Sequence, residues 1–168
     1  MAVATDLLPR NALLQRYNVD GHYADCFVVV VPRTIDLVAF IQAFYTTRLF
    51  RLERLVLSVA LRRRITDTDV DCLARAETDA FAAWTVEARR DKEILLCDIA
   101  GRTRSWLACE TDTAGTTTLR FGSAVLARDG ALSPLIRATI PLHRCYARAL
   151  LRAAHRRLLD KRVLPTSS

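Results

Sequence analysis

The chain has 168 residues, of which 51% are hydrophobic, so it is long and apolar enough for one domain with a sizeable core. Its net charge is +7, and all but two of its 25 basic residues are arginines. The longest uninterrupted apolar run, residues 26–32, is far shorter than the roughly 20 residues of a membrane-spanning helix, so the sequence predicts no transmembrane segment.

The excess of arginine leaves an anionic partner open. Nucleic acid, phospholipid or an acidic ligand would each suit a basic protein. Nucleic acid is the least expected of these, because aromatic residues for base stacking are not interleaved with the arginines. Arginines on the solvent faces of helices explain the charge more simply.

The start of the chain gives no indication of export. Residues 1–18 have neither a basic-then-apolar signal pattern nor a small-residue cleavage site. The five cysteines are an odd number without paired spacing, which is typical of reduced thiols. We therefore expect a cytoplasmic protein. We also expect a single domain over residues 1–168, in which residues 1–22 and 161–168 are peripheral or flexible.

The first predicted element is a strand, Tyr23–Val31, whose four consecutive valines indicate burial on both faces. Thr34 is the predicted cap of a helix that follows. A second helix is predicted over Arg48–Leu61, with apolar residues on one side and arginines on the other. Thr66–Asp69 resembles the start of a third, short helix that ends at about Ala76.

From Asp79 onward the apolar pattern changes to a period of two, which is typical of strands. Four strands are predicted, over residues 81–86, 93–98, 103–110 and 116–127. The short connections between them indicate an antiparallel meander. One face of the last two strands combines apolar side chains with hydroxyls: Thr103, Ser105, Leu107 and Cys109, then Leu119, Phe121, Ser123 and Val125.

One long amphipathic helix is predicted from Ser133 to about Asp160. Ser133 is its cap, and Pro134 suits the first helical position, where no N–H is needed. Pro141 should bend the helix, because it removes one hydrogen bond of the ladder. One stripe of the predicted helix faces the sheet, and arginines at 137, 144 and 148 lie opposite. The stripe contains Leu135, Thr139, Leu142, Tyr146, Ala149 and Ala153.

The order strand, two helices, meander and long closing helix resembles the START-like, or helix-grip, superfamily. The residues that carry the likeness are Glu93–Leu96, the alternating segments 103–110 and 116–121, and Pro141–Arg144 leading into Ala149–Arg152. The end of the chain also resembles a bacterial family of roughly this length with no known function. The resemblance implies an α+β fold in which a curved antiparallel sheet wraps a long C-terminal helix and encloses an apolar cavity.

The sequence departs from that pattern in its number of strands. Helix-grip folds usually have about six strands after the helix pair, and only four are evident here. Either residues 64–79 contain a hairpin, or the sheet is smaller and the cavity is reduced.

The function that we expect is binding of a small apolar or amphipathic molecule between the sheet and the terminal helix. A mostly apolar wall with a few orienting polar groups is typical of a ligand pocket. The same face could instead pack as solid core. The expected ligand-binding residues are Ser105, Leu107, Leu119, Phe121, Leu135, Leu142 and Tyr146.

Two other functions remain open. The first is an enzyme on the same scaffold, such as a cyclase or hydrolase, with an ionisable group in the cavity. The second is a binder of anionic surfaces that uses Arg62–Arg64 and the arginine face of the terminal helix. A homodimer through a sheet edge or an outward-facing Trp106 is also open.

No motif predicts a catalytic residue, a metal site or a cofactor. Asp67, Asp69 and Asp71 have the spacing that opens a calcium loop, but its glycine and its bidentate glutamate are missing. His143 and Cys145 lack the closer pairs and further ligands that a zinc site needs. The five glycines are isolated, so there is no phosphate-binding loop.

Overall fold

The computed structural model describes residues 2–19, 21–51, 65–127 and 130–160. Its centre is one open antiparallel sheet with the strand order β1-β2-β7-β6-β5-β4-β3. The strands are β1 (Ala4–Thr5), β2 (Tyr23–Val31), β3 (Ala80–Phe81), β4 (Trp84–Arg90), β5 (Glu93–Asp98), β6 (Thr103–Thr111) and β7 (Thr117–Val125). The helices are α1 (Leu37–Tyr45), α3 (Asp67–Ala74), α4 (Pro134–Asp160) and a 3-10 turn, η1 (Leu13–Tyr17).

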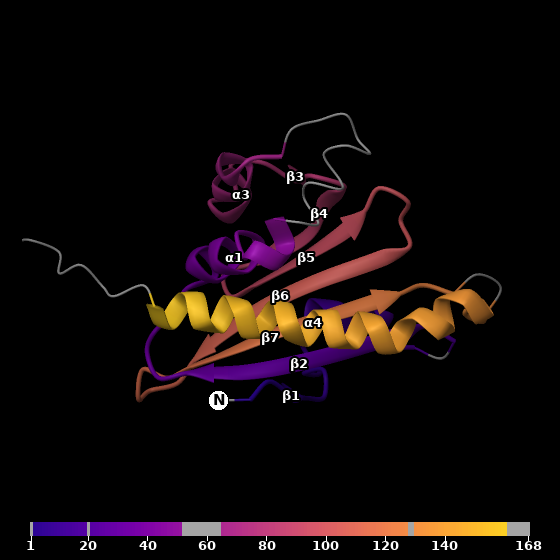
Figure 1. Ribbon diagram of the computed structural model, residues 1–168, viewed down its shortest axis with the longest axis horizontal. Helices are drawn as coiled ribbons and strands as arrows, with labels where there is room; N and C mark the ends of the chain where they lie inside the picture. Colours follow the sequence, from indigo (N-terminus) through magenta and orange to yellow (C-terminus); the bar gives the residue numbers. More distant parts are fainter. Residues whose placement is uncertain (1, 20, 52–64, 128–129, 161–168) are drawn as a thin grey trace, which may run out of the picture.

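The helices and the N-terminal segment cover opposite faces of the sheet. Figure 1 shows α4 lying over the sheet along β7 and β2, with α1 beside it and α3 further towards β3. We call this the inner face; η1 packs on the other, outer face. The predicted α+β class, an antiparallel sheet with a long C-terminal helix, is confirmed.

The predicted meander is present with one more strand. The strand predicted over residues 81–86 is divided between β3 and β4, because the chain turns at Ala82, which has a φ of +53°. Five strands therefore follow α1 and α3 in the described residues, rather than four. A hairpin within residues 64–79 was one explanation for the missing strands. Residues 67–74 form α3 instead, and the additional hairpin begins after this segment.

The helix starts are set by side-chain caps. The helix start predicted at Thr66–Asp69 is confirmed, and Thr66 and Asp69 form a capping box there. The prediction of Thr34 as the first cap is wrong: Asp36 fills this place, and its carboxylate accepts a hydrogen bond from the Ala39 N–H at 2.7 Å. Residues 48–51 begin the second predicted helix, and its remainder, with Arg62–Arg64, lies outside the described residues.

The terminal helix runs from Pro134 to Asp160 as predicted, but it turns a different stripe to the sheet. Leu135 and Leu142 were expected to face the strands, yet they are 77% and 74% exposed. Only the second half of α4 is packed into the core. Its fully or almost fully buried residues are Ala147, Leu150, Leu151, Ala154, His155 and Leu158.

Arg148 also departs from the expected solvent face of α4. Its guanidinium carbon lies 5.2 Å from the centroid of the Phe27 ring, and Nη2 donates to Thr5 Oγ1 at 2.7 Å. The long arginine stem covers apolar surface while its charged end reaches the sheet edge. Arg148 is therefore a packing residue of the helix–sheet interface.

Trp106 points to the outer face, but it is buried rather than exposed. Its indole N–H donates to Glu93 Oε2 at 2.8 Å, and the same oxygen accepts from the Leu13 N–H at 2.9 Å. Leu14 and Cys26 complete this small second core. The expectation of an exposed Trp106 as a dimer contact is wrong, because η1 covers it.

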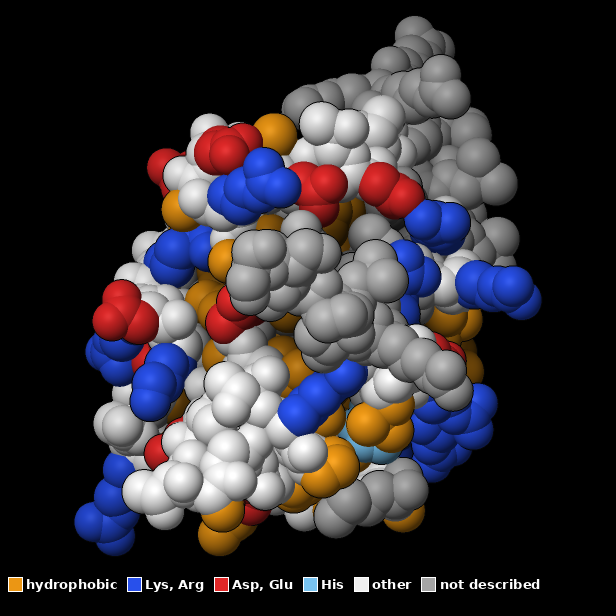
Figure 2. Space-filling view, turned by 90° about the vertical axis from the view of Figure 1, so that its left-hand side faces the viewer, with side chains coloured by type: hydrophobic (Ala, Val, Ile, Leu, Met, Phe, Trp, Pro, Cys, Tyr) orange, Lys and Arg blue, Asp and Glu red, His pale blue; other side chains and the backbone are white. Residues whose placement is uncertain are grey.

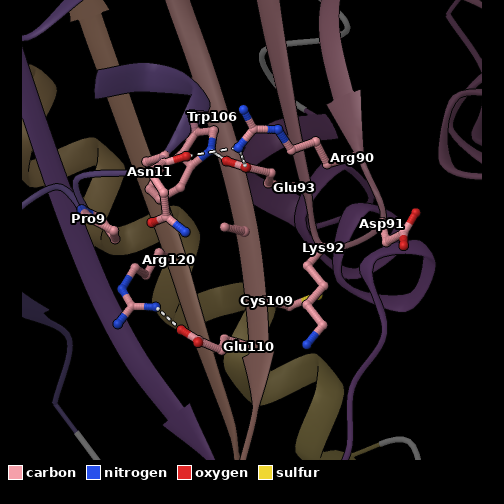
Figure 3. A pocket seen from close by; sticks show the side chains of 12 residues that line it. Pro9, Asn11, Arg90, Asp91, Lys92, Glu93, Trp106, Cys109, Glu110 and Arg120 are labelled. Atoms are coloured by element: carbon pink, nitrogen blue, oxygen red, sulfur yellow. Dashed lines mark hydrogen bonds and ion pairs between the residues drawn. The ribbon is translucent and has the colours of Figure 1, made fainter. Parts of the chain in front are cut away.

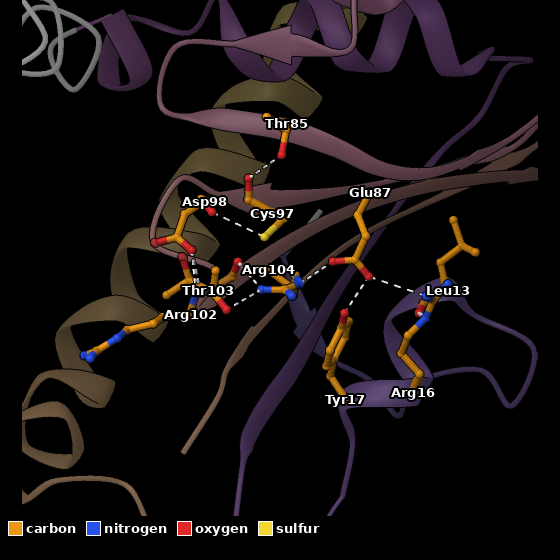
Figure 4. A network of polar contacts seen from close by, with 11 residues as sticks. Leu13, Arg16, Tyr17, Thr85, Glu87, Cys97, Asp98, Arg102, Thr103 and Arg104 are labelled. Atoms are coloured by element: carbon orange, nitrogen blue, oxygen red, sulfur yellow. Dashed lines mark hydrogen bonds and ion pairs between the residues drawn. The ribbon is translucent and has the colours of Figure 1, made fainter. Parts of the chain in front are cut away.

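A second acidic side chain holds η1 from the other end. Figure 4 shows Glu87 of β4 between Tyr17 and Arg104: it accepts the Tyr17 hydroxyl and pairs with the Arg104 guanidinium. That guanidinium carbon also lies 4.6 Å from the centroid of the Tyr17 ring. Glu87 and Glu93 thus fasten the N-terminal segment across the outer face.

Gly122 makes room for this arrangement. It lies opposite both Trp106 and Cys26 in the sheet. A Cβ atom there would be 2.8 Å from Leu14 Cδ2 and 3.0 Å from Trp106 Cε3, closer than real Cβ contacts allow. Only glycine fits beneath η1 without displacing it.

Gly122→Ala should therefore lower the free energy of unfolding by about 1–3 kcal/mol, the usual cost of overpacking a core. Urea denaturation measures the change. Thr118→Ala, half-buried on the same strand, is the control and should cost less than about 1 kcal/mol. Equal stability of wild type and Gly122→Ala would show that η1 is not tightly packed against Trp106.

His155 makes stability depend on pH. It belongs to α4 and is buried, and burial lowers its pKa, while donation from Nε2 to the Val30 carbonyl of β2 at 3.2 Å partly opposes that effect. A lowered pKa in the folded state means that the unfolded chain binds the proton first as the pH falls. Stability from this group is present above the ordinary pKa of about 6.5 and is lost below it.

His155→Gln, which keeps an N–H donor but does not titrate, should flatten this dependence. Between pH 7.5 and pH 5.5 the wild type should lose more unfolding free energy than the variant, as measured by urea melts at each pH. Parallel pH profiles for the two proteins would contradict the assignment.

Candidate functional site: a cavity between the sheet and helix α4

A cavity of about 230 Å³ lies on the inner face, between the sheet, α1 and the middle of α4. Aromatic side chains supply most of its apolar wall: Phe44, Tyr45, Phe50, Trp84, Phe121 and Tyr146. Polar residues also line it: Thr103, Arg104, Ser105, Ser123 and His143, together with the hydroxyl of Tyr45. A mostly apolar hollow with a few convergent polar groups is the usual composition of a small-molecule site.

The structure places three of the residues expected to bind a ligand at this cavity. Ser105, Phe121 and Tyr146 line it. Leu107 and Leu119 lie on the same sheet face but are fully buried in the core beside it. Leu135 and Leu142 are exposed, and neither lines the cavity.

The register of the strands builds the cavity floor. Ser105 lies directly opposite Ser123, and Ser123 lies opposite Asp25 in β2. The mixed face predicted for the last two strands is confirmed, since Thr103 pairs with Val125 in the same register. Three polar residues thus form one row across β6, β7 and β2.

Asp25 is the charged side chain of this row, and only 5% of it is exposed. One carboxylate oxygen, Oδ1, accepts both the N–H and the hydroxyl of Ser123, at 3.0 and 2.6 Å. The other, Oδ2, accepts the hydroxyl of Tyr23 at 2.6 Å. Burial, and after it the bond to Asp25, raises the pKa of Tyr23, so its hydroxyl remains a donor. Three donors offset the cost of burying the carboxylate.

His143 of α4 completes the group. Its Nε2 lies 2.7 Å from Ser123 Oγ and 3.7 Å from Asp25 Oδ2. A carboxylate only accepts hydrogen bonds, so the single hydroxyl hydrogen of Ser123 goes to Asp25, and Nε2–H of His143 donates to Ser123 Oγ. In the neutral imidazole the other ring nitrogen, Nδ1, is then an acceptor. We call Tyr23, Asp25, Ser123 and His143 the polar cluster.

A second pair of hydroxyls lies at the cavity on the α1 side. The Tyr45 hydroxyl is 3.5 Å from Ser105 Oγ, and both residues line the cavity. Tyr45 is almost fully buried, at the end of α1. The floor therefore presents two polar positions, one linked to α1 and one to α4.

A shallower hollow of about 330 Å³ adjoins the cavity at the start of α4. Both hollows are lined by Thr103, Val125 and His143. The hollow at the start of α4 is also lined by Arg102 and Ile140. His143 thus lies at the boundary between the cavity and this wider hollow, which is the natural approach for a ligand.

The outer face carries a larger groove, of about 520 Å³ (Figure 3). Its charged groups are largely engaged in holding the fold together. Arg90 pairs with Glu93 at 2.8 Å, and Arg120 pairs with Glu110 at 3.3 Å. Glu93 also holds Trp106, as described above. Glu110 is itself a surface residue, with 70% of its side chain exposed, and we do not regard this groove as the functional site.

The remaining reactive groups do not extend the site. The thiols of Cys26 and Cys109 are buried, which raises their pKa to about 12 and about 11. Among the described residues, no group of three or more His, Cys, Asp and Glu side chains is placed to hold a metal ion. No helix in the described part of the chain is long and apolar enough to cross a membrane.

Neither the protein-family models nor the curated proteins include a match to this chain. The candidate site therefore rests on its own geometry.

Sequence reasoning missed Asp25, Tyr23 and the role of His143. The available signal was an aspartate inside an apolar strand, since a buried carboxylate needs donors. Two of the three donors come from Ser123, 98 positions away, and only the pairing of β2 with β7 identifies it. His143 was not considered as the partner of a buried carboxylate.

Asp25→Asn should lower the free energy of unfolding by about 2 kcal/mol, because hydrogen bonds to a buried charged group contribute about 1.5–3 kcal/mol. Thermal and urea denaturation measure the loss. Asp91→Asn, in the exposed turn between β4 and β5, is the matched control and should change stability by less than about 0.5 kcal/mol. Equal effects of both substitutions would mean that the polar cluster does not stabilise the fold.

Proposed function

We propose that the protein binds a small apolar or amphipathic molecule in the cavity between the sheet and α4. The observation that carries this proposal is the aromatic wall around a hollow of about 230 Å³ that is also lined by Ser105, Ser123 and His143. The resemblance to the START-like, helix-grip fold is part of the proposal. An open antiparallel sheet with a long terminal helix over one face supports it.

The volume limits the ligand. Each molecule of liquid water takes up about 30 Å³, and a cavity of about 150 Å³ is known to accept benzene. A space of about 230 Å³ therefore suits a molecule of one or two rings, or a short aliphatic chain, rather than a large lipid. Flat aromatic walls favour a ring that can stack or meet them edge-on.

The polar positions would orient such a molecule. His143 and Ser123 lie at the end that adjoins the wider hollow, and Tyr45 and Ser105 lie on the α1 side. An amphipathic ligand would place its hydrogen-bonding groups at these positions and its apolar part against Phe44 and Phe121.

Binding of anionic surfaces has weaker support. Of the arginines that were expected to serve it, 62–64 lie outside the described residues, and Arg148 is occupied with Phe27 and Thr5. On the face that Figure 2 presents, basic side chains are spread around the rim and alternate with acidic ones. A membrane or nucleic acid would be held more strongly by one continuous basic patch.

Binding can be tested with the ketone 2-tetralone, an apolar two-ring probe of suitable size. Wild-type protein should bind it in equilibrium dialysis. Thr103→Trp, which fills the passage between the two hollows, should weaken binding at least tenfold because the indole occupies the ligand's path.

Thr85→Trp is the matched control: it adds the same side chain to an exposed position of β4 and should bind the probe as wild type does. Mass spectrometry of an organic extract of the purified protein would identify a ligand that is retained. Equal binding by all three proteins would place the probe elsewhere, and no binding by the wild type would remove the support for the cavity.

A further inference from the structure

The cavity floor holds two polar positions at a spacing that suits acid–base chemistry. Ser105 and Ser123 are directly opposite on β6 and β7. Cβ atoms of such pairs are about 4.5–5.5 Å apart. Each serine has a different partner above the sheet: Tyr45 on α1 and His143 on α4. The two positions can therefore act on neighbouring atoms of one small molecule.

The first position is built to accept a proton. Nε2–H of His143 is committed to Ser123 Oγ, which leaves Nδ1 as the basic atom of the neutral ring. When Nδ1 is protonated, the positive ring lies 3.7 Å from Asp25 Oδ2 and remains linked to Oδ1 through the Ser123 hydroxyl. Asp25 is itself buried, so water screens this attraction little. A histidine oriented by a carboxylate is a common general base.

The second position is built to donate hydrogen bonds. Tyr45 and Ser105 each carry a hydroxyl and lie side by side at 3.5 Å. They lack a formal charge, and the surrounding wall is aromatic. Hydroxyl donors fixed in an apolar cavity stabilise an oxygen on which negative charge develops.

We propose that the cavity is a proton-transfer site for small enolisable ketones, with His143 as the base and Tyr45 and Ser105 as the donors to the carbonyl oxygen. This inference rests on the proposed binding function and adds a reaction to it. Apart from the hydroxyl and imidazole groups, the wall is apolar, which matches a ketone of one or two rings.

The reaction requires no further reagent. The bond between hydrogen and the carbon next to the carbonyl breaks, and the proton moves to Nδ1 of His143. The electron pair of that bond forms the carbon–carbon double bond of the enolate, and the carbonyl π pair moves to oxygen, where the hydroxyls of Tyr45 and Ser105 stabilise it. Return of the proton to the same carbon restores the ketone; in a β,γ-unsaturated ketone, its return to the γ carbon shifts the double bond into conjugation.

The competing explanation is that the polar cluster only fastens α4 to the sheet. Exchange of carbon-bound protons with solvent distinguishes the two, because a purely structural histidine does not change that rate. The protons at C1 of 2-tetralone, which lie between the aromatic ring and the carbonyl, serve as the probe in D₂O, and their loss is followed by proton NMR.

Wild-type protein should accelerate the exchange well above an equal concentration of free imidazole. His143→Gln, which keeps an N–H donor for Ser123 but has no basic nitrogen, should lower the protein-catalysed rate at least about 100-fold, as is typical for loss of a general base. Tyr45→Phe should lower it about tenfold or more, because one donor to the oxygen is lost. Dialysis gives the 2-tetralone affinity of each protein, so that exchange rates are compared at equal occupancy.

Arg156→Gln, an exposed change on the same helix, is the control and should exchange as wild type does. Thermal melts verify that each variant is folded; if His143→Gln is not, Tyr45→Phe decides the question alone. Binding without accelerated exchange in the wild type, or equal rates in wild type and the folded variants, would overturn this inference and leave the binding function intact. Absence of 2-tetralone binding and exchange would overturn both.

Discussion

The cavity exists because only the second half of α4 packs closely against the sheet. Small residues at 147 and 154 allow the helix to approach the strands there, and leucines on either side fill the remaining space. The first half has no such small buried residues: Leu135 and Leu142 are exposed, and His143 and Tyr146 stand between helix and sheet. The hollow follows from this difference in side-chain size and direction along one helix.

The polar cluster is the other condition for the site, because it fixes α4 at the point where apolar packing ends. A carboxylate inside a protein is costly unless donors surround it, and here the donors come from β2 and β7, while His143 of α4 donates to Ser123. The same contacts that hold the helix also set which nitrogen of His143 carries a proton. Fold stability and the chemistry of the cavity therefore depend on one set of hydrogen bonds.

Local patterns in the sequence were sufficient for the elements and for one face of the sheet. Alternation predicted that Ser105, Phe121 and Ser123 share a face, and the register of β6 and β7 confirms it. The prediction of which stripe of α4 faces the sheet was wrong, because a mixture of alanines, leucines and arginines leaves several stripes of similar hydrophobicity. Only contact with the strands selects one of them. Asp25 and His143 could not be paired in advance, since their proximity results from tertiary structure rather than from spacing along the chain.

The two faces of the sheet use buried acidic residues in different ways. On the outer face, Glu87 and Glu93 form ion pairs with arginines, and Glu93 accepts a hydrogen bond from η1, so both carboxylates hold the N-terminal segment on the sheet. On the inner face, Asp25 accepts hydrogen bonds from the hydroxyls of Tyr23 and Ser123, and Ser123 links it to His143. An aspartate matched by an arginine would make a fixed ion pair. Matched through serine to a histidine at a cavity wall, it leaves an imidazole nitrogen where a ligand would lie.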